Sequence, residues 1–164
     1  QKNMGPAGTT LVIIKDEILG KTGRKIPAML DYTTHIGSGS MFNTPPVFPI
    51  YVSMLTLEWL KNLGGVSAIE KINQEKADLL YNEIDRNPLF EGTANKEDRS
   101  NMNICFLLTD SSKETQFNEM WDEVGISGIK GHRSVGGYRA SIYNAMPKQS
   151  IQVLVDIMRK LEKN

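Results

Sequence analysis

Apolar positions recur at helical spacing in three stretches of the chain. Residues 51–63 and 67–85 are predicted as two helices, because their apolar side chains repeat with a period of about 3.6, and Gly64-Gly65 separates them. Residues 148–163 form a third predicted helix with one apolar stripe. That stripe consists of Ile151, Leu154, Val155, Met158 and Leu161. Such a stripe is typical of a core, and we assign it no other role.

Short β-branched or aromatic runs predict the strands. Residues 9–15 are predicted as a buried strand, 103–108 as a strong strand, 138–143 as another and 89–92 as a weak one. Alternation on the strand 138–143 places Arg139 on the face opposite Tyr138 and Ala140. Strands that alternate with helices in this way predict a mixed α/β chain.

The remaining segments are shorter or irregular. Residues 16–19 are predicted as a helical turn, 26–32 as a short extended segment, and 113–123 as a helix. Residues 33–49 carry glycines and prolines at their centre and are predicted to be irregular. The Gly64-Gly65 break, followed by a long helix, is the predicted domain junction.

Composition narrows the functional classes. The 164 residues carry 19 basic and 19 acidic side chains, so the chain has no net field with which to hold a nucleic acid. No apolar run has the length needed to cross a bilayer. Two histidines and one cysteine, far apart, argue against a zinc site. We therefore expect no nucleic acid, membrane or metal partner.

The single cysteine and the first residues carry further expectations. One cysteine cannot form an internal disulfide, so a reducing cytoplasm is the default location. For Cys105 itself, a small buried side chain on a central strand is favoured over a catalytic thiol. The chain begins at Gln1 within a turn rich in glycine and proline, which indicates a cut through a longer protein.

Three constellations combine polar groups with glycines that permit unusual backbone angles. The first is Gln1-Lys2-Asn3-Met4-Gly5-Pro6-Ala7-Gly8, directly before the predicted strand 9–15. A lysine buried there would lose its proton readily, because burial penalises the ammonium form, and the neutral amine could attack a carbonyl carbon. An exposed lysine at a frayed terminus is the alternative, and this segment alone favours it.

The second constellation is Ser38-Gly39-Ser40-Met41-Phe42-Asn43-Thr44-Pro45-Pro46. Its hydroxyls, side-chain amide and backbone N–H groups could bind a phosphate, and the two prolines fix the shape of the loop. A plain surface loop with local hydrogen bonds is the alternative. Nearby, His35 has no partner set of its own and is predicted to be structural.

The third constellation is Gly131-His132-Arg133-Ser134-Val135-Gly136-Gly137, which leads into the strand that carries Arg139. Two guanidinium groups a few residues apart suit one small dianion and one carboxylate. Surface arginines in weak ion pairs are the alternative. Gly20-Lys21-Thr22 imitates the end of a P-loop but has Lys15 where that motif needs a glycine, so nucleotide hydrolysis is rejected.

Taken in this order, the three segments resemble the phosphoserine aminotransferase family of class V pyridoxal-phosphate aminotransferases. The resemblance covers essentially the whole chain and corresponds to the family's C-terminal half; Phe42 and Val47 depart from its common pattern. It implies the α/β architecture of a fold-type I aminotransferase. Residues 1–64 would form the end of the large, mainly parallel-sheet domain that binds the cofactor. Residues 65–164 would form a small C-terminal α+β domain that begins with the helix 67–85.

The resemblance also implies how pyridoxal 5′-phosphate is bound. Lys2 would hold the cofactor covalently and move the proton between the substrate α-carbon and the cofactor. Gln1 would help to hold the cofactor phosphate. Asn43 and Thr44 would bind the phosphate of the cofactor in the neighbouring subunit, so that the active site would belong to a homodimer.

The implied substrates are small anions. His132 and Arg133 would bind the substrate phosphate, and Arg139 its α-carboxylate. The implied ping-pong reaction moves an amino group reversibly from L-glutamate to 3-phosphohydroxypyruvate, giving phosphoserine and 2-oxoglutarate in serine biosynthesis. Activity on 4-phosphohydroxythreonine, in vitamin B6 synthesis, stays open. The chain alone is expected to be inactive, because the family's N-terminal half supplies the aromatic and the aspartate that contact the cofactor ring.

Two alternatives remain. One is a different class V enzyme, either an alanine–glyoxylate aminotransferase or a cysteine desulfurase. The His132-Arg133 pair speaks against both, because their substrates carry no phosphate. The other alternative is a non-catalytic anion-binding module, which has no need of a lysine in a glycine-rich turn.

Overall fold

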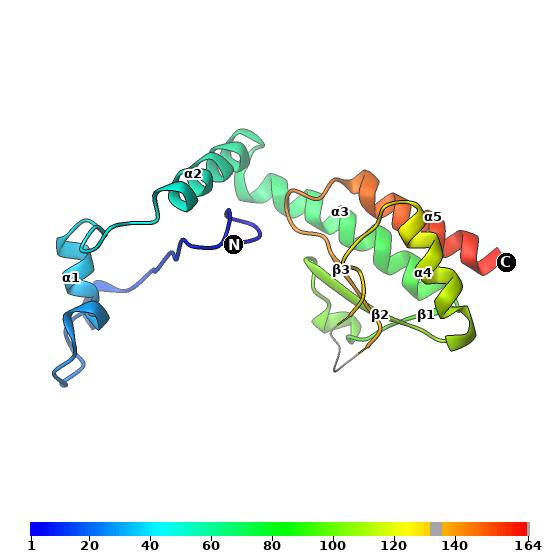
Figure 1. Cartoon of the computed structure of the whole chain (residues 1–164), viewed down its shortest axis with the longest axis horizontal. Helices are drawn as coiled ribbons and strands as arrows, with labels where there is room; N and C mark the ends of the chain where they lie inside the picture. Colours follow the sequence, from blue (N-terminus) through cyan, green and yellow to red (C-terminus); the bar gives the residue numbers. More distant parts are fainter. Residues whose placement is uncertain (132–135, 164) are drawn as a thin grey trace. The chain divides into compact units, whose positions relative to one another are not determined.

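The computed structural model describes residues 1–131 and 136–163. The chain divides into two compact units, Gln1–Trp59 and Leu60–Asn164, which we call unit 1 and unit 2 (Figure 1). No helix in the described part of the chain is long and apolar enough to cross a membrane.

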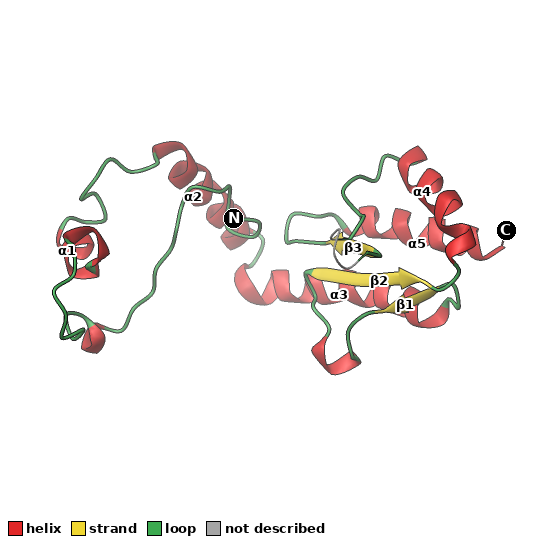
Figure 2. Ribbon diagram, turned by 60° about the horizontal axis from the view of Figure 1, so that its bottom comes forward, coloured by secondary structure: helices red, strands yellow, loops and turns green. Residues whose placement is uncertain are grey.

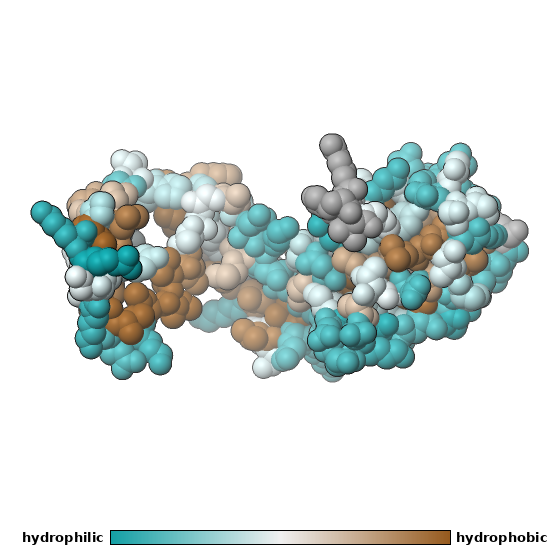
Figure 3. Space-filling model, turned by 90° about the horizontal axis from the view of Figure 1, so that it is seen from below, coloured by the Kyte–Doolittle hydropathy of each residue, from teal (hydrophilic) through white to brown (hydrophobic). Residues whose placement is uncertain are grey.

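Unit 1 consists of short helices joined by long loops. In chain order it contains the 3₁₀ turns η1 (Asp16–Ile18) and η2 (Ala28–Leu30), and the helices α1 (Tyr32–Gly37) and α2 (Val47–Asn62), the last of which ends in unit 2. Among residues 1–59, all of which the structure describes, none is buried. Hydrophobic side chains therefore gather at the surface of this unit, at the left of Figure 3.

The predicted strand at residues 9–15 is not formed, and that prediction is wrong for this chain. The segment is irregular, and Ile13 is 90% exposed. A strand requires a neighbouring backbone that accepts and donates its hydrogen bonds. The described residues of unit 1 contain no second strand that could serve as this neighbour.

Residues 26–49 are more helical than predicted. Instead of an extended segment, η2 occupies residues 28–30, and α1 follows where an irregular chain was expected. Asp31 caps α1, because its Oδ1 accepts the Thr33 N–H at 3.0 Å and the Thr33 hydroxyl at 2.7 Å. The helix α2 begins at Val47, with Pro49 in its first turn, where the missing N–H costs no helical hydrogen bond.

Unit 2 combines one antiparallel sheet with three long helices (Figure 2). In chain order it contains α3 (Gly65–Arg86), β1 (Phe90–Gly92), η3 (Lys96–Asp98), β2 (Asn103–Leu108), η4 (Ser111–Lys113), α4 (Glu114–Glu123), β3 (Tyr138–Ser141) and α5 (Lys148–Lys163). The described strands are ordered β1-β2-β3. The helix α3 packs against α5, β1 and β2, and α4 packs against α5.

The core of unit 2 lies between the helices and one face of the sheet. On β2, Ile104 and Phe106 are fully buried, whereas Leu107 is exposed. The ring of Phe117, from α4, lies 5.0 Å from that of Tyr138 and 5.2 Å from that of Phe90. The other face of the sheet carries Leu107 and Arg139, which are both exposed, and we call it the open face.

The predicted helices and strands of unit 2 are confirmed to within a few residues, as is the helix 51–63. All five residues of the predicted stripe on α5 are buried. Gly64 separates α2 from α3 because its φ of 112° lies in the left-handed region, where a side chain is disfavoured. The predicted helices and strands of unit 2 therefore pack against one another within this chain.

Buried polar side chains join α3 to α5. The Glu83 carboxylate accepts hydrogen bonds from Arg86 at 2.6 Å, from Arg159 at 2.9 Å and from Asn87 at 3.1 Å. Burial raises the pKa of Glu83, but these donors outweigh burial, so the pKa lies below its usual value. The network stabilises the helix pair because each donor is directed at an ionised carboxylate.

Candidate functional site

The loop that carries Lys2 has an unusual backbone. Lys2 adopts a φ of 78°, which is rare for any residue with a side chain, and Gly5 and Gly8 have φ values of 130° and 112°. Backbone held in the left-handed region at a non-glycine residue stores free energy and is found preferentially at functional sites. Ser40, in the second constellation, is the other described non-glycine residue with a positive φ, at 64°, so the unusual backbone falls within two of the three constellations.

Two glycines hold this loop close to α2. A Cβ atom at Gly5 would lie 2.6 Å from Ser53 Oγ, and one at Gly8 would lie 3.0 Å from Pro49 Cγ. The distance at Gly5 is too short for a side chain, the one at Gly8 is tight, and the positive φ at both positions disfavours any other residue, so glycine lets the loop approach the helix this closely. The side chain of Lys2 is thus placed by a loop that is fitted to α2.

Lys2 is exposed in unit 1. This agrees with the exposed lysine that the segment alone favours, and the burial that would lower the pKa of the amine is not found in this chain. Gln1 is exposed as well. Their assignment as cofactor ligands stays a prediction that rests on the backbone geometry and on the residue types.

The loop between α1 and α2 holds the second constellation. Ser38 and Ser40 make local hydrogen bonds: the Ser38 hydroxyl donates to the Thr34 carbonyl at 2.9 Å, and the Ser40 N–H donates to the His35 carbonyl at 2.8 Å. Such local bonds are what the plain-loop alternative predicts. Asn43 and Thr44, by contrast, are exposed. The loop is therefore tied to α1 by local hydrogen bonds and exposes the Asn43 amide and the Thr44 hydroxyl just before α2.

His35 has local partners only. Its Nε2 atom lies 3.0 Å from the Met29 carbonyl oxygen, and its ring packs edge-to-face on Phe42 with centroids 5.9 Å apart. These contacts join η2 to α1 and to the loop that follows. The prediction of a structural histidine is thus confirmed. No group of metal-binding side chains occurs among the described residues.

Arg139 lies on β3, on the open face of the sheet. Tyr138 and Ala140, its neighbours along the strand, are buried at 5% and 7% exposure, whereas Arg139 is exposed, so the predicted alternation is confirmed. Its cross-strand partner is Cys105 on β2. Cys105 is only half-buried, which corrects the expectation of a buried side chain, because it points to the face that the helices leave open. His132 and Arg133 lie outside the described residues.

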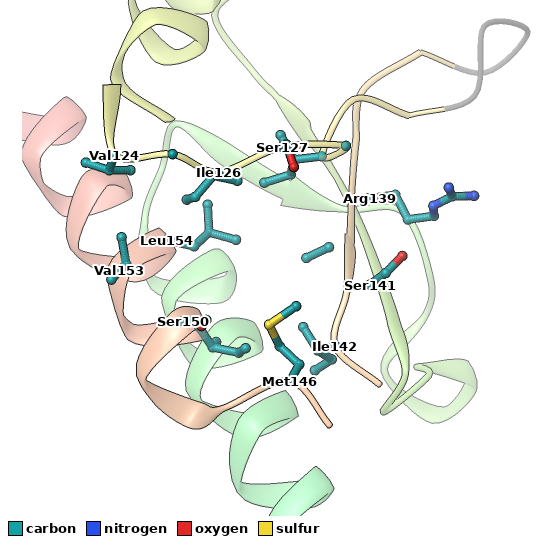
Figure 4. A pocket seen from close by; sticks show the side chains of 15 residues that line it. Val124, Ile126, Ser127, Arg139, Ser141, Ile142, Met146, Ser150, Val153 and Leu154 are labelled. Atoms are coloured by element: carbon teal, nitrogen blue, oxygen red, sulfur yellow. The ribbon is translucent and has the colours of Figure 1, made fainter. Parts of the chain in front are cut away.

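A cleft of about 340 Å³ opens beside β3, between the loop 124–129 and the start of α5. Its walls are largely apolar, with Ile126, Ile142, Val153 and Leu154 among them. Arg139 belongs to the rim, but its guanidinium group points away from the cleft (Figure 4). Among the residues that line it, the cleft therefore offers no inward-pointing cation for an anionic ligand.

Three polar residues beside Arg139 were not predicted. Asn103 Oδ1 accepts hydrogen bonds from the Tyr143 hydroxyl at 2.9 Å and from the Ser141 hydroxyl at 3.2 Å. Alternation along β2 and β3 could have placed Asn103 and Ser141 on the face of Arg139, but it could not have shown that they meet. That contact depends on the register, in which Asn103 pairs with Ser141.

Comparison with known proteins identifies the relationship. The family model described as Aminotransferase class-V matches residues 1–154. The phosphoserine aminotransferase of Flavobacterium psychrophilum is 71% identical over 162 residues, which are 99% of this chain and 46% of that protein. A solved structure named for radiation damage of the Schiff base in phosphoserine aminotransferase has a TM-score of 0.92 at 46% identity, and it covers 99% of this chain and 46% of its own.

A second solved structure, the phosphoserine aminotransferase from Bacillus circulans subsp. alkalophilus, has a TM-score of 0.92 at 39% identity over 99% of this chain and 45% of its own. The chain thus spans about half the length of the relatives that it matches. The family model covers the chain from the loop of Lys2 to α5. By sequence and by fold, the chain belongs to the class V aminotransferase family.

Proposed function

We propose that this chain is part of a phosphoserine aminotransferase, which transfers an amino group reversibly between L-glutamate and 3-phosphohydroxypyruvate. The observation that carries the proposal is the 71% identity to a protein of that name along 99% of the chain. The structure adds a lysine on a left-handed backbone, in a loop fitted to α2 by two glycines. An anion-binding module would have no use for such a lysine.

The donor set of unit 1 fits pyridoxal phosphate. Lys2 offers a primary amine for an aldehyde carbon, and the left-handed backbone at this position fits a built site better than a frayed terminus. Bound pyridoxal phosphate would act as an electron sink for the substrate α-carbon. Lys2 Nζ is the base that moves the α-proton, and the Gln1 amide donates to the cofactor phosphate.

Asn43 and Thr44 are proposed to bind the cofactor phosphate of a second subunit. Both side chains are exposed on the loop that precedes α2, and neither carries a charge. Neutral amide and hydroxyl groups can donate hydrogen bonds to a phosphate without the cost of burying a cation. The whole protein is then a homodimer whose two active sites each take residues from both subunits.

The substrate's two anionic ends are assigned to different residues. His132 and Arg133 bind the phosphate, and Arg139, exposed on the open face of the sheet, binds the α-carboxylate. A guanidinium group suits a carboxylate because its N–H groups donate two parallel hydrogen bonds. Beside it, Asn103 Oδ1 accepts the hydroxyls of Ser141 and Tyr143, so the polar groups next to Arg139 are held by hydrogen bonds to one another.

The domain and cellular assignments follow from the same proposal. Residues 1–64 belong to the large domain that binds the cofactor, and residues 65–164 form the small domain. We place the whole protein in the cytoplasm, where a phosphorylated intermediate of amino-acid synthesis is made and used. Its substrates are small molecules.

Reductive trapping tests the proposal. The full-length protein is loaded with pyridoxal phosphate, reduced with borohydride and digested, and the labelled peptide is identified by mass spectrometry. The label should lie on Lys2, and the variant Lys2→Arg should carry no label and transfer no amino group. Lys25→Arg, a change at another exposed lysine of unit 1, should keep both properties.

Substrate preference separates the proposal from its alternatives. The enzyme should transfer the amino group of phosphoserine but not that of serine or alanine, because only phosphoserine engages His132 and Arg133. Equal turnover of the unphosphorylated amino acids would point to another class V enzyme. Binding of phosphoserine without a borohydride-stable label would point to a non-catalytic module.

A further inference from the structure

A lysine is buried at the centre of unit 2. Lys76, on α3, has no exposed surface. Its Nζ atom donates to the carbonyl oxygens of Tyr143 at 2.8 Å, Ile142 at 3.1 Å and Met146 at 3.1 Å. These carbonyls belong to one turn, residues 142–146, which directly follows β3 and leads to α5. A single side chain thus holds three backbone groups of the turn.

The geometry suits an ammonium group. A protonated lysine has three N–H donors and no acceptor, and three carbonyl oxygens receive them. No carboxylate pairs with Lys76 among the described residues, and burial lowers its pKa. A cation that is buried without a counter-ion costs folding free energy. A neutral side chain of the same length at this position would not have this cost, so the three hydrogen bonds are what the lysine contributes.

A second anchor acts on the same turn. Asn73 lies one helical turn before Lys76 on α3, and its Nδ2 atom donates to Asn144 Oδ1 at 2.8 Å. The turn is also closed from within, because the Met146 N–H donates to the Tyr143 carbonyl at 2.9 Å. The Tyr143 carbonyl therefore accepts two hydrogen bonds, one from its own turn and one from Lys76.

Tyr143 connects this turn to the open face of the sheet. Its hydroxyl donates to Asn103 Oδ1, which also accepts the Ser141 hydroxyl. Ser141 lies two residues after Arg139 and therefore on the same face of β3. In Figure 4 the side chains of Arg139 and Ser141 point away from the cleft, which Ile142 and Met146 line. A shift of the turn would therefore move the end of the strand that carries Arg139.

We propose that Lys76 is a positioning residue for substrate binding. By holding residues 142–146 against α3, it fixes the end of β3 and the Asn103–Tyr143 contact, and so sets the position of the Arg139 guanidinium group. The effect on substrate rests on the proposed function, in which Arg139 binds the α-carboxylate. The immobilised turn itself does not depend on that function.

The test uses the full-length enzyme and the variant Lys76→Met, which keeps an unbranched side chain but has no donor. Lys71→Met is the matched control, because Lys71 is an exposed lysine on the same helix. Two quantities are measured: amide hydrogen exchange of residues 138–146, and kcat and KM for phosphoserine. A third enzyme, Arg139→Ala, and its combination with Lys76→Met complete the set.

Lys76→Met should speed amide exchange in residues 138–146 and leave exchange in α4 unchanged. The KM for phosphoserine should rise by roughly ten- to a hundredfold with little change in kcat, because displacing a binding group by about 1 Å can cost about 10²-fold. In the Arg139→Ala background, Lys76→Met should raise KM no further. Lys71→Met should resemble the wild type in every measurement.

The outcomes separate the two proposals. An unchanged KM in Lys76→Met, or an equal rise in the Arg139→Ala background, would overturn the positioning role while leaving the transaminase activity intact. A wild-type enzyme that does not act on phosphoserine would remove the proposed function, and the exchange data would then decide whether Lys76 holds the turn. If Lys76→Met does not fold, Asn73→Ala removes the donor of the second anchor and should change KM in the same direction; an unchanged KM there would also count against the proposal.

Discussion

Similar apolar runs are exposed in unit 1 and buried in unit 2. Ile13 in unit 1 and Ile104 in unit 2 both lie in short apolar runs that predict a strand, yet Ile13 is 90% exposed and Ile104 is fully buried. The local patterns are comparable, and the neighbours differ: β2 pairs with β1 and β3, whereas the segment 9–15 has no partner strand in its unit. An apolar run of this kind can therefore form a buried strand, but it does so only where a partner strand is available.

The helices show the same contrast. The helices α2 and α5 both contain 16 residues. On α5 the apolar residues form one stripe, and that stripe is buried. On α2 apolar residues surround the helix, so that Phe48 and Leu57, which are nine residues apart and therefore on opposite sides, are both exposed. A helix that is apolar all round is typical of a position covered from several directions.

Separating the units should give the largest effect. Residues 60–164 expressed alone should unfold cooperatively, with a free energy of unfolding of about 5 kcal/mol or more, because their core lies within the fragment. Residues 1–59 alone should show no cooperative transition. Urea titration followed by circular dichroism measures both. A cooperative transition in residues 1–59 would show that unit 1 has a core of its own, and the contrast would fail.

Two phenylalanine substitutions should sharpen the contrast. Phe117→Ala in unit 2 should lower the free energy of unfolding by about 3–5 kcal/mol, because it removes a fully buried ring and leaves a cavity. Phe48→Ala in unit 1 should change it by less than about 0.5 kcal/mol, because that ring is 72% exposed. Urea unfolding of this chain gives both values. Equal losses would mean that Phe48 is packed in solution.

These differences explain what the sequence could predict. The elements of unit 2 were predictable because each apolar pattern has its packing partner in the chain, as the stripe on α5 shows. The strand 9–15 was predicted wrongly because its pattern presupposes a partner. The helix α1 was missed because the glycines and prolines of the segment 33–49 outweighed Asp31 and Thr33, which form a recognisable helix start.

The candidate site was predictable in part for the same reason. The face on which Arg139 lies follows from alternation along one strand, which is a local property. The role of Lys76 does not follow locally, although its place among the buried positions of α3 is a signal that could have been noticed. Its partners lie 66 to 70 residues away along the chain, and only the folded structure brings them together.

The free energy of unfolding of unit 2 should fall at low pH, because Glu83 becomes protonated there. Because its pKa is lowered below the usual 4.5 on folding, the carboxylate contributes stability that is fully present above pH 4.5 and is lost as the pH falls through the folded value. Glu83→Gln should lower the free energy of unfolding by about 1–3 kcal/mol at pH 7 and flatten its decline below pH 4.5. Urea titrations from pH 7 to pH 3 measure this.

Glu17 in unit 1 provides the control. Its carboxylate lies 3.7 Å from Lys15 Nζ, and both side chains are largely exposed. An exposed pair of this kind contributes little to stability. Glu17→Gln should therefore leave the pH profile of unfolding unchanged. If Glu83→Gln also keeps the wild-type slope, the Glu83 network contributes nothing specific to the helix pair.

The smallest expected effect lies at the start of α1. Helices of six residues are marginal in isolation, and α1 has no buried residue to hold it, so it depends on the cap from Asp31. Asp31→Ala should reduce the helical population of residues 32–37 by about fivefold, as the loss of an N-cap does. Asp31→Asn should keep it, because an asparagine oxygen also accepts the Thr33 N–H. Backbone chemical shifts measure the population, and global unfolding of unit 2 should be the same in both variants. A loss of global stability in Asp31→Ala would mean that α1 is coupled to the core of unit 2, and the two units would then have to be treated as one cooperative structure.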